Sequence, residues 1–251
     1  MASLSAEIPA ILAAIAIVCP AYAQTARYPH KVVRWVVPYA AGGGTDVVAR
    51  PIALAMGDVM GQPVAYDNRG GGNGLIAGEI VARAAPDGYT LLVGSPAIMT
   101  TNQNLYAKMP FDPLRDFIPI TKFANVPNML AARAALPVGR IQEIVPYAKA
   151  NPGKLRWASS GTGSAGTMSV ELFKLTTGID VITIPYKGAG PALLSVISNE
   201  ADMMFANPAV FMPQIKAGRL RALGTASLER SAALPDMPTF HESGFPGFDS
   251  I

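Results

Sequence analysis

Two stretches of this chain place a glycine-rich turn between an apolar strand and the start of a helix. The first runs from Trp35 to Arg50 (WVVPYAAGGGTDVVAR) and the second from Leu155 to Lys174 (LRWASSGTGSAGTMSVELFK). A helix N-terminus carries unpaired backbone N–H groups and a partial positive charge, so it attracts anions. Two such ends facing one cleft would hold a small carboxylate from both sides without a buried cationic side chain.

Neither turn carries a complete nucleotide motif. Gly161–Gly166 spells G-x-G-x-x-G, but the next strand ends at Ile184–Lys187 without the acid that a dinucleotide site needs. Gly42–Asp46 lacks the Lys-Ser/Thr pair of a phosphate-binding loop. Three successive glycines nevertheless allow close backbone approach to a ligand. We expect anion-binding turns here, and a dinucleotide-dependent α/β enzyme stays as an alternative.

Residues for catalysis are sparse. The chain has two histidines, His30 and His241, at opposite ends of the sequence. It contains no G-x-S-x-G elbow and no His and carboxylate cluster with metal-ligand spacing. Tyr186-Lys187-Gly188 follows an apolar strand, where open α/β sheets place ligand groups. These features predict a binding protein without metal or cofactor rather than an enzyme.

The N-terminus is predicted to be a secretory signal. The apolar run Ala10–Cys19 is too short to span a bilayer and leads to the A-x-A site at Ala21–Ala23, although the leader lacks Lys and Arg. Removing residues 1–23 deletes the single cysteine, so no disulfide is expected in the remainder. The net charge of the whole chain is +3, without a basic run. That balance is compatible with an anionic small ligand and argues against nucleic acid.

Short apolar runs alternate with helical patterns, which predicts an α/β fold with parallel sheet covered on both faces. Extended segments are expected at 32–37, 90–93, 126–132, 181–184, 203–205 and 220–226. Helices are expected at 46–60, 76–84, 140–151, 167–177, 189–198 and 208–217. Pro51 conflicts with the first helix, so either the helix kinks there or it begins later. Crossings near residues 124 and 224 would divide the chain into two lobes.

The chain resembles the Bug/TctC-type periplasmic solute-binding proteins, which are the extracytoplasmic receptors of tripartite tricarboxylate transporters. The resemblance covers Tyr28 to Ile251. It rests on the combination of five motifs: Val37–Asp46 (VPYAAGGGTD), Pro86–Leu92 (PDGYTLL), Ala150–Lys154 (ANPGK), Pro185–Gly188 (PYKG) and Leu234–Thr239 (LPDMPT).

This resemblance implies a two-lobed Venus flytrap fold of type II-like topology. Lobe 1 is expected to comprise residues 24–124 plus 225–251, and lobe 2 residues 125–224. Relatives have further elements after the position of Ile251, so lobe 1 is expected to be incomplete and the chain truncated at its C-terminus. Relatives typically have His-Leu where this chain has Thr167-Met168, so the ligand's identity does not carry over.

The resemblance implies a periplasmic receptor that delivers a carboxylate to the membrane components of a transporter. The ligand is expected to be a di- or tricarboxylate, an amino acid or an aromatic acid; a sensory receptor for a two-component system is the other reading of the same fold. Motifs and resemblance together predict these ligand-binding residues: Tyr39, Ala41, Gly42, Gly43, Thr45, Asp46, Gly94, Ser95, Ser159, Gly161, Gly163, Ser164, Thr167, Tyr186, Lys187, Gly188 and Asn207.

Overall fold

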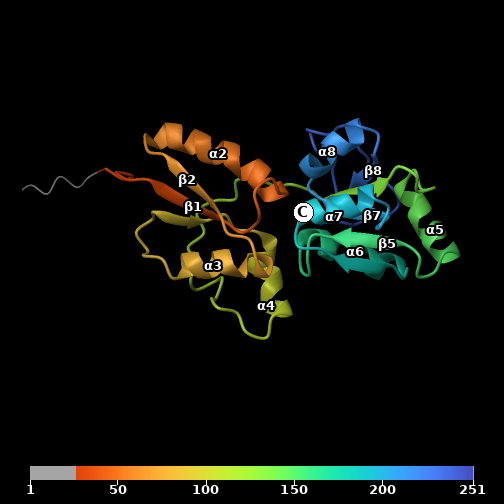
Figure 1. The fold of residues 1–251 in the computed structure, drawn as a ribbon, viewed down its shortest axis with the longest axis horizontal. Coiled ribbons are helices and arrows are strands. Elements are labelled where there is room, and N and C mark those ends of the chain that lie inside the picture. The colour runs from red at the N-terminus through yellow and green to blue at the C-terminus, as the bar shows by residue number, and fades with distance from the viewer. Residues whose placement is uncertain (1–26, 251) are drawn as a thin grey trace, which may run out of the picture.

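The computed structural model describes residues 27–250, which form two α/β lobes lying side by side (Figure 1). The predicted leader at residues 1–23 lies outside the described residues. Within residues 27–250, no helix is both long and apolar enough to cross a membrane. Each lobe has its own sheet, so the expected fold class and two-lobed architecture are confirmed.

The first lobe is built on a three-stranded parallel sheet in the order β2-β1-β3. Its elements are β1 (Val33–Val37), α2 (Gly44–Met60), β2 (Val64–Asn68), η1 (Gly72–Gly74), α3 (Leu75–Ala82), β3 (Thr90–Leu92), η2 (Ala97–Thr101) and α4 (Asn102–Leu105). Alternate residues of β1 pack against the small side chains Ala49 and Ala53 of α2. Helices α2 and α3 lie on opposite sides of this sheet (Figure 1).

Helix α2 begins two residues before the expected start and contains Pro51 in its interior. Gly43 is the N-cap, and Gly61 ends the helix in the left-handed conformation that glycine favours. Because the helix begins at Gly44, a later start near Pro51 is the wrong alternative. Pro51 is exposed to solvent.

The second lobe contains a five-stranded sheet in the order β6-β5-β7-β4-β8. Its elements are β4 (Met129–Arg133), η3 (Ile141–Glu143), α5 (Ile144–Ala150), β5 (Arg156–Ser159), α6 (Ala165–Thr177), β6 (Ile182–Pro185), α7 (Ala189–Ile197), β7 (Met203–Ala206), α8 (Pro208–Lys216) and β8 (Leu220–Thr225). Strand β4 runs antiparallel to both β7 and β8. The expectation of a wholly parallel sheet is therefore wrong here, because β4 enters from the other lobe without a helical crossover.

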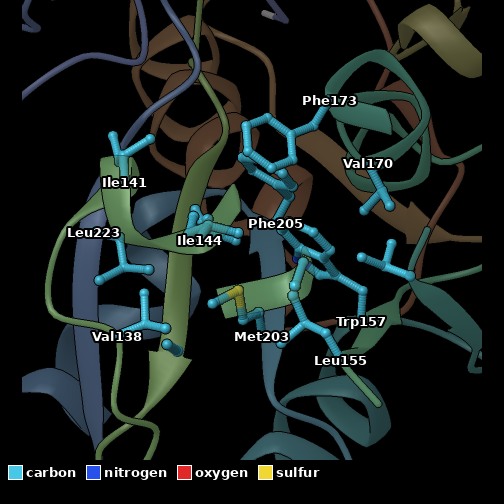
Figure 2. Close-up of a cluster of buried hydrophobic side chains, with 14 of the residues drawn as sticks. Val138, Ile141, Ile144, Leu155, Trp157, Val170, Phe173, Met203, Phe205 and Leu223 are labelled. Atoms are coloured by element: carbon cyan, nitrogen blue, oxygen red, sulfur yellow. The ribbon is translucent and has the colours of Figure 1, made fainter. Parts of the chain in front are cut away.

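Both faces of the second sheet are buried. Successive residues of a strand point to opposite faces, so Trp157 and Ala158 of β5 belong to different core clusters. On one face, Trp157 packs with Phe173 of α6 and Phe205 of β7 (Figure 2). Helices α7 and α8 cover the other face.

Residues 226–250 pack on the second lobe, which corrects the expectation that 225–251 joins the first. Phe240 and Phe248 are buried in the aromatic cluster of Trp157, and Phe240 lies 5.5 Å from Phe173 between ring centroids. The Ser250 N–H donates to the Ala226 carbonyl oxygen (2.9 Å). The physical reason is that β8 pairs with β4 inside the second sheet, so the chain does not return to the first lobe at residues 220–226.

Candidate functional site

A cleft lies between the two lobes, and it is part of a cavity of about 2250 Å³ that extends over α3, β3 and residues 116–126. Loops that follow β1 and β3 line it from the first lobe, and loops that follow β5, β6 and β7 line it from the second. Parallel strands present their carboxyl ends at one edge of a sheet, which is where open α/β sheets bind ligands. The carboxyl ends of the parallel strands, where binding sites most often lie, therefore face each other across the cleft.

The structure brings most of the predicted residues together at this cleft. The predicted residues that line it are Tyr39, Ala41, Gly42, Gly43, Thr45, Gly94, Ser95, Gly161, Ser164, Tyr186, Lys187, Gly188 and Asn207. Four others are not part of the lining: Asp46, Ser159, Gly163 and Thr167. The side chains of Asp46 and Thr167 instead hold the two glycine-rich turns in shape.

Asp46 fixes the turn before α2. The Gly42 N–H donates to its Oδ2 (3.0 Å), while Arg50 Nη2 (2.8 Å) and Asn68 Nδ2 (3.1 Å) donate to its Oδ1. Asp46 is only 5% exposed. Burial alone would raise the pKa of this carboxyl, but the hydrogen bonds from Gly42, Arg50 and Asn68 and the charge of Arg50 hold it below its ordinary value. Both oxygens of the carboxylate therefore accept hydrogen bonds from within the first lobe, and the bond from Gly42 keeps the backbone of the turn in place.

Replacing Asp46 by asparagine is expected to lower the free energy of unfolding by about 1–3 kcal/mol at pH 7, because buried donors lose a charged acceptor. The lowered pKa means that the stabilisation is complete above the unfolded-state pKa, about 3.9, and is lost as the pH falls through the folded-state value. The difference between wild type and Asp46→Asn should therefore shrink in urea denaturation at pH 3. Asp58→Asn, at an exposed position of the same helix, is the control. An equal difference at both pH values would contradict this role.

Thr167 fixes the turn before α6 from behind. Its hydroxyl donates to the Gly161 carbonyl oxygen (2.7 Å), and its N–H donates to Ser164 Oγ (3.3 Å). Ser164 is the N-cap of α6, so it occupies one amide that was expected to face an anion. Ser159 is buried at the end of β5 and does not reach the cleft.

Three helix N-termini at the cleft lack a side-chain cap. In the first lobe these are the starts of α2 at Gly43 and of α3 at Gly74, and in the second lobe the start of α7 at Gly188. In contrast, Ser164 caps α6 and Asn207 caps α8, where Asn207 Oδ1 accepts from the Ala209 N–H (2.9 Å). The first N–H groups of α2, α3 and α7 therefore have no side-chain acceptor and are available to an anion. The pair expected from the sequence was α2 and α6, whereas the uncapped helix start in the second lobe is that of α7.

Few charged side chains reach the cleft. Those in its lining are Asp116, Lys122 and Lys187. Lys187 is exposed beside the uncapped start of α7, and it forms no ion pair with any residue between 27 and 250. Cations in excess of acids in a cleft favour anionic ligands.

Tyr39 joins the two strand ends of the first lobe. Its hydroxyl lies 3.0 Å from Ser95 Oγ, so the loops after β1 and β3 are connected at the cleft wall. Burial raises the pKa of the Tyr39 phenol. The phenol therefore stays neutral and can both donate and accept a hydrogen bond.

A pair of asparagines at the cleft was not predicted. Asn73 Nδ2 donates to Asn102 Oδ1 (2.9 Å), and Asn102 Nδ2 donates to the Asn73 carbonyl oxygen (3.1 Å). Asn73 lines the cleft within the glycine cluster Gly70–Gly74, and Asn102 is fully buried. The glycine cluster itself was the available signal. Nothing in the sequence marks Asn102, which follows the unpredicted π-helix η2.

Comparison with known proteins gives consistent matches. A family model described as tripartite tricarboxylate transporter family receptor matches residues 48–251. BugT of Bordetella pertussis is 35% identical over 249 residues, which is 99% of this chain and 76% of that protein. Rpa4515 of R. palustris, solved with adipate, has a TM-score of 0.84 at 37% identity, covering 88% of this chain and 74% of that one. MatC of Rhodopseudomonas palustris, solved with bound malate, has a TM-score of 0.79 at 35% identity, covering 88% and 76%.

Proposed function

Because this chain belongs to the tripartite tricarboxylate transporter receptor family, we propose that it captures a small carboxylate in the cleft between its lobes and delivers it to a membrane transporter. This family consists of solute-binding receptors, not enzymes. We also propose that residues 1–23 direct export and that the protein acts in the periplasm. Two similar proteins are described with adipate and malate, so a dicarboxylate is the first ligand class to test.

The observation that carries the proposal is the pair of uncapped helix starts at Gly43 and Gly188. Each leaves backbone N–H groups without a side-chain acceptor, and both residues line one cleft. The two oxygens of a carboxylate can accept hydrogen bonds from several such N–H groups at once. Lys187 adds a cation beside the second helix start, which favours ligands with more than one negative charge.

A thermal-shift screen tests this proposal. Malate, adipate, citrate, amino acids and aromatic acids should include at least one ligand that raises the melting temperature. At one hundred times its dissociation constant, a ligand stabilises the folded protein by about 2.7 kcal/mol. The neutral diamide of the best acid is the matched control and should give no shift. The acid should be recovered unchanged, since no turnover is expected. If none of the acids shifts the melting temperature, the carboxylate-receptor proposal is wrong.

A further inference from the structure

The lobes touch across the cleft at a glycine on each side. A Cβ atom added to Gly44, at the start of α2, would lie 2.6 Å from the Cβ of Asn207 in the second lobe. A Cβ atom added to Gly163, in the turn before α6, would lie 2.3 Å from Leu105 Cδ1 and 2.9 Å from Asn73 Nδ2 in the first lobe. Real Cβ atoms do not come this close to other heavy atoms. Each of the two glycine-rich turns therefore has room for a side chain from the opposite lobe only because it carries glycine at this position.

Asn207 is held rigidly for this contact. Its Oδ1 accepts from the Ala209 N–H (2.9 Å), which caps α8, and its Nδ2 donates across the cleft to the Gly44 carbonyl oxygen (3.3 Å). The Asn207 side chain thus accepts a hydrogen bond from its own lobe and donates one to the first lobe. Its orientation is fixed by the cap before the lobes meet.

We propose that Asn207 is a positioning residue whose contact with Gly44 sets the closed position of the lobes. This inference rests on the proposed function, because closure matters only if the cleft holds a ligand. The apparent affinity of a two-lobed receptor falls with the fraction of molecules that can close. A side chain at residue 44 would lower that fraction through its conflict with Asn207.

The substitution Gly44→Ala makes it possible to separate an effect on lobe closure from an effect on folding. It lies in the first turn of a helix and has no left-handed φ, so alanine suits the backbone of the isolated lobe. The three atoms nearest to the Cβ that Gly44→Ala adds all belong to Asn207. Asn207→Gly removes the opposing Cβ, and glycine at an N-cap costs only a few tenths of a kcal/mol.

The experiment measures the distance between the lobes by electron spin resonance. Spin labels are placed at Val59→Cys in the first lobe and Leu175→Cys in the second, which are 88% and 84% exposed, in a full-length chain with Cys19→Ser. In the absence of ligand, Gly44→Ala should shift the distance distribution toward the open form, and Gly44→Ala with Asn207→Gly should shift it back. Gly57→Ala lies in the same helix, and its added Cβ meets only ordinary contacts with residues 62–64; it should leave the distribution unchanged.

Calorimetry with malate and adipate completes the test. For whichever acid binds wild type, Gly44→Ala should weaken binding at least tenfold while its melting temperature without ligand is not lowered. A Gly44→Ala protein with the wild-type distance distribution would overturn the inference, and so would an open form that Asn207→Gly fails to reverse. If neither acid binds wild type, the choice of ligand or the proposed function fails, while the ligand-free distances still decide whether this contact sets closure.

Discussion

Replacing Phe240 by alanine is expected to lower the free energy of unfolding by about 3–5 kcal/mol, because a large buried ring is removed from a close-packed core. Phe240 is 0% exposed. Its ring centroid lies 4.7 Å from that of Phe248 and 5.4 Å from that of Phe205. Its neighbours Phe173 on α6 and Phe205 on β7 are themselves packed in this core, so they can fill the space only in part. This loss is a large fraction of the stability of an ordinary domain.

The measurement can be confined to the second lobe. The chain has two tryptophans, Trp35 in the first lobe and Trp157 in the aromatic cluster. In a Trp35→Phe background, fluorescence during urea unfolding reports on Trp157 alone. Leu175→Ala, at an exposed position of α6, is the control and should change the unfolding free energy by less than about 0.5 kcal/mol. A similarly small effect of Phe240→Ala would show that residues 226–250 do not pack on this lobe in solution.

The elements that could be predicted are those with local signals. Each predicted helix corresponds to a helical segment, because glycines such as Gly61 and Gly178 mark the helix ends and apolar spacing marks the buried face. Strand β2 and helix α4 were missed. Strand β2 has no fully buried residue and ends in Asp67 and Asn68, so it lacks the continuous apolar run that identified the other strands.

Long-range pairing could not be predicted. The antiparallel direction of β4 depends on the place where the chain enters the second sheet. The position of residues 226–250 depends on contacts of Phe240 and Phe248 with residues some 70 positions earlier, such as Phe173. A loop rich in proline and glycine gives no indication of which lobe will bury its aromatic rings.

The candidate site could also be predicted only in part. Glycine-rich turns at the ends of strands were visible in the sequence, and the structure places both at one cleft. The roles of Asp46 and Thr167 were not visible, because each is the third residue of its helix and turns back to its own loop. Residues at this helix position often form such backward hydrogen bonds. A polar residue three positions after an N-cap is therefore better assigned to the turn than to the ligand.

Replacing Gly43 by valine is expected to raise the dissociation constant of the bound carboxylate by at least about 100-fold, or about 2.8 kcal/mol. Gly43 is the uncapped N-cap of α2 and lines the cleft, and its φ of −73° permits any residue. The effect is therefore not expected from backbone strain. A β-branched side chain would instead fill the space through which the ligand reaches the helix start, and its Cβ would already lie 3.2 Å from the Ala40 carbonyl oxygen.

The comparison with Lys187→Ala decides between two ways of holding the ligand. Lys187 is exposed at the cleft, and a solvated ion pair contributes about 0–1 kcal/mol, so this variant should weaken binding about fivefold or less. Gly139→Val is the matched control, since Gly139 is an exposed loop residue outside the cleft lining. Calorimetry on the three variants gives the order directly. If Lys187→Ala weakens binding more than Gly43→Val does, the ligand is held mainly by an ion pair, and the helix starts contribute little because their amides remain bound to water.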